Sequence, residues 1–106
     1  MTTAPVMSQV TKIATSLGLS EDELFRQSLI SFLHEQKRQV LQLKLDILAR
    51  YGAESPMDLE TKIAQAVVVE HPAWEDLIVT ENLTARLVEL NDYLDNLQNP
   101  ENHRPE

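Results

Sequence analysis

A long stretch of this sequence, from Ser20 to Tyr51, holds neither Gly nor Pro. Because those two residues interrupt α-helices most strongly, the stretch predicts a single long helix. At 1.5 Å per residue such a helix reaches about 45 Å, which is too long for one compact core in a small chain. Its apolar residues gather towards its two ends, whereas residues 34–39 in the middle are all polar. We therefore expect the two ends of this helix to be buried against different surfaces.

Capping residues mark the ends of the expected helices. Apolar residues recur at helical spacing over residues 6–17, and Gly18 follows them, at the kind of position where a helix commonly ends. Ser20 and Glu23 form a capping box at the start of the long helix. Gly52 ends that helix, and Ser55 followed by a proline predicts the start of a short one. The first two helices are therefore joined by a tight turn.

A leucine seam characterises the last expected helix, which runs from Pro72 to about Leu97. Its leucines alternate in steps of four and three, as in a coiled coil, at Leu83, Leu87, Leu90, Leu94 and Leu97. The nearest apolar surface of similar length is Val40 to Tyr51, at the end of the long helix. The sequence therefore predicts an all-α fold, in which a short N-terminal helix-turn-helix pair runs into a long helix and an antiparallel helical hairpin follows.

We divide the chain into three regions. Residues 1–33 form an N-terminal helix pair, residues 34–98 hold the rest of the long helix and the hairpin, and residues 99–106 form a polar tail that we expect to be disordered. The N-terminal pair is too small to bury its own apolar side chains. We therefore expect a homodimer formed through Ile13, Leu17, Leu24, Leu29, Phe32 and Leu33.

The net charge of −8 is unevenly distributed along the chain. Residues 1–51 hold six basic and five acidic residues, whereas residues 52–106 hold three basic and twelve acidic ones. A field of one sign attracts a basic partner and repels nucleic acid. Acidic residues also simply keep a small helical protein in solution. Both interpretations of the acidic half stay open from the residues alone.

Two parts of the sequence resemble known families. The segment "VTKIATSLGLSEDELFRQSLISFLHEQ" is similar to the helical part of ribbon-helix-helix antitoxins, in which a first helix ends at a Leu-Gly turn and a Ser-capped second helix follows. The segments "RYGAESPMDLETKIAQ" and "EHPAWEDLIVTENL" resemble a family of small prokaryotic proteins that are associated with toxin–antitoxin gene pairs. The resemblance implies a dimeric, antitoxin-like protein that binds and neutralises a basic, RNase-type toxin.

The acidic C-terminal half supplies the candidate partner-binding residues. Trp74 is the only Trp of the chain and stands among acidic residues, and Trp is enriched where proteins bind one another. The alternative, which the general rarity of binding hot spots favours, is that Trp74 is a structural anchor that holds the Val-rich segment 67–69 on the helix pair. The surface that we predict to cover the basic partner consists of Glu70, Trp74, Glu75, Asp76 and Glu81.

A DNA-binding dimeric regulator is one alternative function, and a structural coiled-coil adaptor is another. Ribbon-helix-helix proteins read DNA with a strand before the first helix, but residues 1–9 here hold no Lys or Arg and include Pro5. The candidate DNA contacts are then Lys12 and Arg26, which are few because phosphate contacts supply much of the affinity. We expect weak DNA binding or none.

The sequence contains no pattern typical of an enzyme or of a cofactor site. It has no Cys and no Gly-rich phosphate loop, and its three His residues lack the spacing of zinc ligands. No segment reaches the roughly 20 apolar residues that span a bilayer, and the first residues do not resemble a signal sequence. We therefore expect a cytoplasmic protein without enzymatic activity, bound metal or cofactor.

Overall fold

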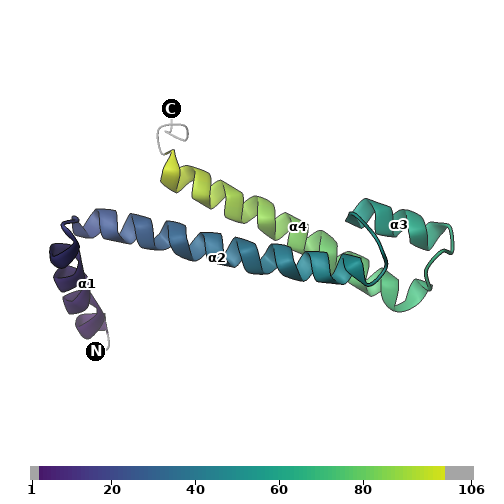
Figure 1. Cartoon of the computed structure of the whole chain (residues 1–106), viewed down its shortest axis with the longest axis horizontal. Helices are drawn as coiled ribbons and strands as arrows, with labels where there is room; N and C mark the ends of the chain where they lie inside the picture. Colours follow the sequence, from purple (N-terminus) through teal and green to yellow (C-terminus); the bar gives the residue numbers. More distant parts are fainter. Residues whose placement is uncertain (1–2, 100–106) are drawn as a thin grey trace.

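The computed structural model describes residues 3–99, which form four helices and no strand (Figure 1). The helices are α1 (Thr3–Leu17), α2 (Glu21–Ala49), α3 (Pro56–Ala64) and α4 (Glu70–Gln98). The all-α prediction is therefore confirmed. The tail that we expect to be disordered, residues 99–106, lies outside the described residues except for Asn99.

The two long helices, α2 and α4, lie antiparallel and side by side as a hairpin (Figure 1). α3 packs on the start of α4, at the end of the hairpin where α2 finishes. α1 stands at the opposite end, contacts α2 and points away from the hairpin. The molecule is consequently elongated, with a radius of gyration of 20.0 Å, whereas a compact chain of this length has about 13 Å.

The core lies at the α3 end of the hairpin, where three helices meet. One apolar cluster is formed by Leu48, Leu59, Ala73 and Leu77, each at most 2% exposed. Leu90 and Leu94 continue the buried side of α4 along the hairpin. Thr80 is also buried, and its hydroxyl donates to the Leu77 carbonyl at 2.8 Å, so the burial leaves no polar atom unpaired. The core therefore holds α3 and the near ends of α2 and α4 as one unit.

The helices start and stop at the residues that the sequence predicts as caps. The Ser20 hydroxyl accepts from the Glu23 N–H and the Ser55 hydroxyl from the Asp58 N–H, both at 3.0 Å. Gly18 ends α1 with φ 73° and Gly52 follows α2 with φ 64°, in the left-handed region where a side chain would be strained. α4 differs slightly, because His71 and Pro72 have non-helical backbone angles and the regular helix follows them.

The register of the hairpin differs from the predicted one, in which residues 83–97 pair with residues 40–51. The Tyr51 hydroxyl donates to the Asp76 carboxylate, and Arg50 Nη1 lies 3.5 Å from Asp76 Oδ2. These contacts place the residues that follow α2 against the start of α4. The reason is the short α3 connection, which turns the chain back immediately after α2 ends.

The leucine seam of α4 consequently faces the earlier part of α2 within the same chain. Arg26 Nη1 donates to the Leu97 carbonyl at 2.8 Å, which joins the start of α2 to the end of α4. Between these ends, Val40 lines the same groove as Leu83 and Leu90. Residues 26–40 thus lie along the seam. The division that we predict between residues 33 and 34 falls inside α2, which continues through it.

Replacing Leu77 with Ala should destabilise the fold by about 2–5 kcal/mol, because it removes a fully buried side chain from the core and leaves a cavity. Ile78 is the matched control: it follows directly on α4 but is 53% exposed, so Ile78→Ala should change stability by less than about 0.5 kcal/mol. Urea denaturation of both variants measures the difference. Equal effects would show that the side of α4 assigned to the core is wrong.

Replacing Asp76 with Asn should lower the pKa of Tyr51 towards its ordinary value. The hydrogen bond to the Asp76 carboxylate, aided by burial, raises the pKa of Tyr51. The pKa of Tyr51 is higher in the folded than in the unfolded state. The hydrogen bond therefore contributes its full stabilisation of the fold below the unfolded-state pKa of about 10, and this stabilisation is lost as pH rises through the folded-state pKa. Absorbance titration in a Tyr93→Phe background, where Tyr51 is the remaining tyrosine, follows this group. An identical titration curve after Asp76→Asn would contradict the contact.

Candidate functional site

Acidic side chains are concentrated on α4. The helix holds seven acidic residues and one basic residue, Arg86. Five of the seven are exposed, and Asp76 and Asp95 are half-buried. Arg86 is itself close to a carboxylate, because its Nε lies 3.6 Å from Glu89 Oε1. α4 therefore presents strongly negative charge to solvent.

The first turns of α4 form an exposed, negatively charged corner. The Trp74 indole N–H donates to Glu70 Oε2 at 3.0 Å, and the residue is 38% exposed. His71 Nδ1 lies 3.0 Å from Glu75 Oε2. A hydrogen bond from its own backbone, followed by the contact with His71, lowers the pKa of Glu75, so this carboxylate is charged at neutral pH. Three of the predicted partner-binding residues, Glu70, Trp74 and Glu75, are thus brought together.

The other two predicted partner-binding residues have different surroundings. Glu81 is exposed. Asp76 is half-buried and already bound to Tyr51 and Arg50, so it holds the hairpin together. Spacing along α4 does not reveal this, because Tyr51 is 25 residues away in the sequence. A partner would have to break those contacts to reach Asp76.

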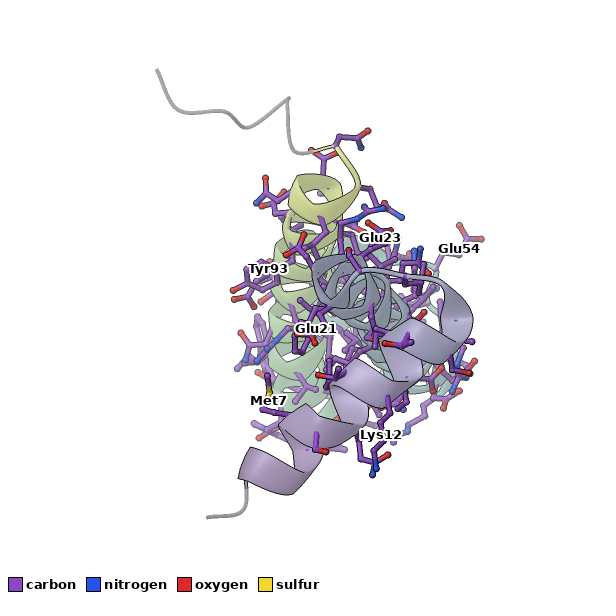
Figure 2. All side chains as sticks on the ribbon, turned by 90° about the vertical axis from the view of Figure 1, so that its left-hand side faces the viewer. Met7, Lys12, Glu21, Glu23, Glu54 and Tyr93 are labelled. Atoms are coloured by element: carbon purple, nitrogen blue, oxygen red, sulfur yellow. The ribbon has the colours of Figure 1, made fainter. Side chains whose placement is uncertain are left out.

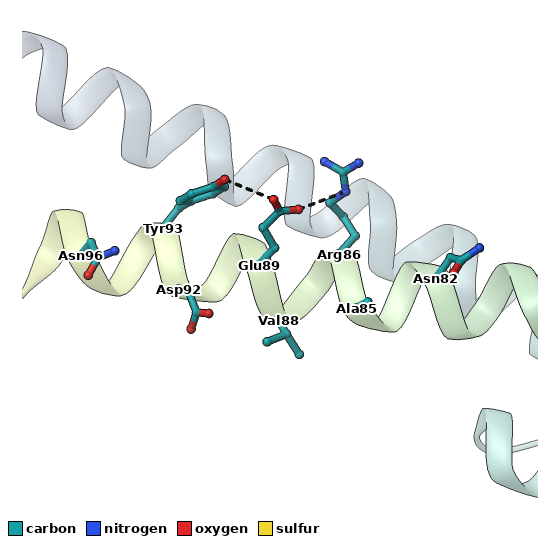
Figure 3. Close-up of a pocket in the computed structure, with 8 residues that line it drawn as sticks. All are labelled: Asn82, Ala85, Arg86, Val88, Glu89, Asp92, Tyr93 and Asn96. Atoms are coloured by element: carbon teal, nitrogen blue, oxygen red, sulfur yellow. Dashed lines mark hydrogen bonds and ion pairs between the residues drawn. The ribbon is translucent and has the colours of Figure 1, made fainter. Parts of the chain in front are cut away.

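A second acidic stretch, outside the predicted partner-binding residues, lies further along α4. The Tyr93 hydroxyl donates to Glu89 Oε2 at 3.2 Å, while Arg86 approaches the other oxygen (Figure 3). The surroundings are shallow, because every lining residue comes from this one helix: Asn82, Ala85, Arg86, Val88, Glu89, Asp92, Tyr93 and Asn96. Helical spacing of Glu81, Glu89 and Asp92 is the signal in the sequence. We call Glu70, Trp74, Glu75, Glu81, Glu89 and Asp92 the acidic face.

A groove also runs between the two long helices. It is lined by Gln36, Val40, Asn82, Leu83, Arg86 and Leu90. Its floor is apolar, from Val40 and two leucines, and polar side chains of both helices border it. The sequence does not show this groove, because it depends on the register of α2 and α4.

The residues predicted to form a homodimer are largely uncovered. Ile13 is 45% exposed, Leu17 61%, Leu29 48% and Phe32 59%. Leu24 and Leu33 are half-buried within the chain. Phe25 lies in the same region and is 43% exposed, although our predicted interface omits it. The region around α1 and the start of α2 therefore has apolar side chains that the chain itself does not bury.

The two candidate DNA-contacting side chains differ in whether they are free to bind a phosphate. Lys12 is exposed on the outer side of α1 (Figure 2). Arg26 is held on both sides, because its guanidinium donates to the Glu23 carboxylate at 3.2 and 3.0 Å and to the Leu97 carbonyl. α1 is helical from Thr3 onwards, where a ribbon-helix-helix protein has its strand. The geometry therefore gives little support to DNA contact through these two residues.

Within residues 3–99, no three or more His, Asp or Glu side chains cluster in a way that would hold a metal ion. In the same part of the chain, no helix combines the length and the apolar character that crossing a bilayer requires.

Comparison with known proteins places the chain in a family. No curated protein and no solved structure matches the chain. The model of one family matches residues 1–102, and this match spans all four helices. On that match, the chain belongs to the Uncharacterized protein MJ0235 family.

Proposed function

We propose that this protein is antitoxin-like: it binds a basic, RNase-type protein through the acidic face and neutralises it. The observation that carries this proposal is the excess of seven acidic residues over one basic residue on α4. A protein that cleaves RNA must present positive charge to phosphates. A helix lined with carboxylates competes for that same surface, and the opposite charges speed the encounter.

Apolar side chains among the carboxylates support the same proposal. Ile78 is 53% exposed and Val88 57%, and both lie on α4 close in sequence to members of the acidic face. Binding surfaces combine an apolar centre with a charged rim, and Trp is a frequent anchor in the centre. Trp74 stands in that position, with its indole N–H already satisfied by Glu70. The resemblance of residues 50–65 and 70–83 to proteins from toxin–antitoxin gene pairs points to the same class of partner.

Homodimerisation through residues 10–33 is part of the proposal. A dimer covers the exposed side chains of Ile13, Leu17 and Leu29 and leaves the acidic face open to a partner. The DNA-binding alternative is not favoured by any contact described above. A purely structural coiled-coil adaptor would need its leucine seam free, whereas α2 covers that seam within the chain.

Reversing three charges of the acidic face should abolish partner binding. Glu75, Glu81 and Asp92 are exposed, so changing them to Lys should preserve the fold, which circular dichroism and the melting temperature would check. Capture with the tagged wild-type chain from its own cells should recover a basic protein whose RNA cleavage the chain inhibits. The triple variant should bind this protein at least about tenfold more weakly, mainly through slower association.

The matched control for this experiment changes the same number of charges elsewhere. Asp22, Glu54 and Glu60 are exposed acidic residues outside α4, and their change to Lys alters the net charge by the same amount. Surface plasmon resonance should show little loss of affinity for this control. Equal losses in both triple variants would mean that net charge alone governs binding, and unchanged affinity after reversal of the acidic face would refute the proposed function.

Changing both Leu29 and Phe32 to Glu should convert a dimer into monomers of 12.1 kDa. Both side chains are about half-exposed, so the fold should survive, whereas two carboxylates buried in an apolar interface are costly. Sedimentation equilibrium measures the mass. The control is Leu41→Glu with Leu45→Glu, at similarly exposed positions of α2 outside residues 10–33. A double variant with the same mass as the wild type would refute dimerisation through residues 10–33.

A further inference from the structure

We propose that a second copy of the chain covers the flank of the hairpin on which the groove opens, so that two hairpins form a four-helix bundle. This inference rests on the dimer within the proposed function and extends it: the interface continues along α2 and α4, far beyond residue 33. It does not depend on the basic partner, although the interface includes Glu89 of the acidic face.

The first half of the interface is a row of side chains on α2. Phe25, Leu29, Phe32, Gln36 and Leu43 follow one another in steps of three, four or seven residues, which places them on one side of a helix. Gln36 lines the groove, so the row runs along the groove side. Its four apolar members are between 43% and 59% exposed. Within residues 3–99 this row is therefore only partly covered.

The second half is a matching row on α4. Val79, Asn82, Arg86, Glu89 and Tyr93 follow in steps of three or four residues, and Glu89 also belongs to the acidic face. Asn82 and Arg86 line the groove, opposite Gln36. Val79 is 40% exposed and Tyr93 49%. Tyr93 lies on the side of the hairpin towards which the Met7 end of α1 extends, so α1 borders the same flank (Figure 2).

The opposite flank of the hairpin is more polar. The corresponding row on α2 consists of Gln27, Ser31, His34, Arg38, Leu41 and Leu45. Four of these six residues are polar, whereas four of the five in the row through Phe25 are apolar. Because the groove flank has the more apolar row on α2, it is the flank that gains more from burial against another protein surface.

The pattern of the two rows suits a second copy of the chain. The row on α2 is polar at Gln36, and the row on α4 is polar at Asn82, Arg86 and Glu89, whereas both rows are apolar at their ends. A two-fold axis through the middle turns the rows end to end, so apolar side chains meet apolar ones and polar groups meet near the axis. Each Arg86 then also lies near the Glu89 carboxylate of the other copy, which offsets the repulsion between the two guanidinium groups.

The exposed area of the chain agrees with an interface of this size. The accessible surface is 7580 Å², whereas a compact monomer of 12.1 kDa exposes about 6,000 Å². The excess is larger than the roughly 800 Å² that each partner buries in an interface of standard size. A second hairpin along the groove flank removes apolar surface that an isolated chain leaves in water.

Leu43 and Leu45 provide a matched pair of test positions. Both are leucines of α2, both are 48% exposed, and they lie on opposite flanks of the hairpin. Leu43→Glu should raise the dimer dissociation constant about tenfold or more, because it puts a carboxylate into the interface, and Leu45→Glu should leave the constant unchanged. Val79→Glu tests the row on α4 and should act like Leu43→Glu. Sedimentation equilibrium measures each constant, and circular dichroism checks the fold.

The outcomes separate this inference from the dimer on which it rests. If Leu43→Glu and Val79→Glu leave the constant unchanged while Leu29→Glu with Phe32→Glu gives monomers, the dimer is confined to residues 10–33 and the four-helix bundle is wrong. If Leu43→Glu and Leu45→Glu weaken the dimer equally, the four-helix bundle is also wrong, because the contact between the two copies would not be limited to the groove flank. A wild-type chain that is monomeric at every concentration would overturn both ideas and leave the binding of a basic partner untouched.

Discussion

The apolar seam between α2 and α4 is the interaction on which the rest of the molecule depends. At one end it is fixed by the cluster that joins Leu48, Leu59 and Leu77, where α3 closes the connection between the long helices. At the other end, the guanidinium of Arg26 donates to the Leu97 carbonyl near the end of α4. Because both helices are long and few residues remain to cover them, the seam yields an elongated hairpin with open flanks rather than a compact bundle.

This arrangement gives the two sides of α4 different roles. Its inner side supplies leucines and Thr80 to the hairpin, whereas its outer side carries carboxylates with exposed apolar residues between them. Asp76 adds to the negative charge of α4, but its carboxylate contacts Tyr51 and Arg50 and so helps to hold the hairpin together. The proposed partner therefore meets the outer side, and the proposed second copy meets the groove flank. The two proposed surfaces adjoin at Glu89, which contacts Arg86 and Tyr93.

Local features of the fold are predictable from the sequence, because they depend on residues close together in the chain. Ser20, Ser55, Gly18 and Gly52 act within a few residues of their own positions, and each is found where its pattern places it. The register of the hairpin is not predictable in this way. A seam of evenly spaced leucines fits several positions along α2, and the choice is made by α3 and its core cluster, which pattern alone does not position.

The candidate site is predictable in part for the same reason. The excess of acidic residues on α4 is visible in the composition, and Trp74 and Glu75 are neighbours in the sequence. The contact between Glu70 and Trp74 spans the non-helical backbone at His71 and Pro72, which helical spacing does not predict. Asp76 binds Tyr51, which is 25 residues away in the sequence, and Arg26 binds the carbonyl of Leu97, which is 71 residues away. A single sequence does not indicate such distant contacts. The groove and its flank likewise exist only once the register is known.

The register is most directly tested by disulfide formation, which is specific in this chain because it has no Cys. Val40 and Leu83 line the same groove, so Val40→Cys with Leu83→Cys should oxidise to a bridge within one chain, since bridged residues have Cα atoms within about 7 Å. Val40→Cys with Leu97→Cys, the pair that the alternative register brings together, should stay reduced. Gel mobility without reductant and mass spectrometry would read the result. A bridge in the second pair and none in the first would contradict the account of how α2 and α4 pack.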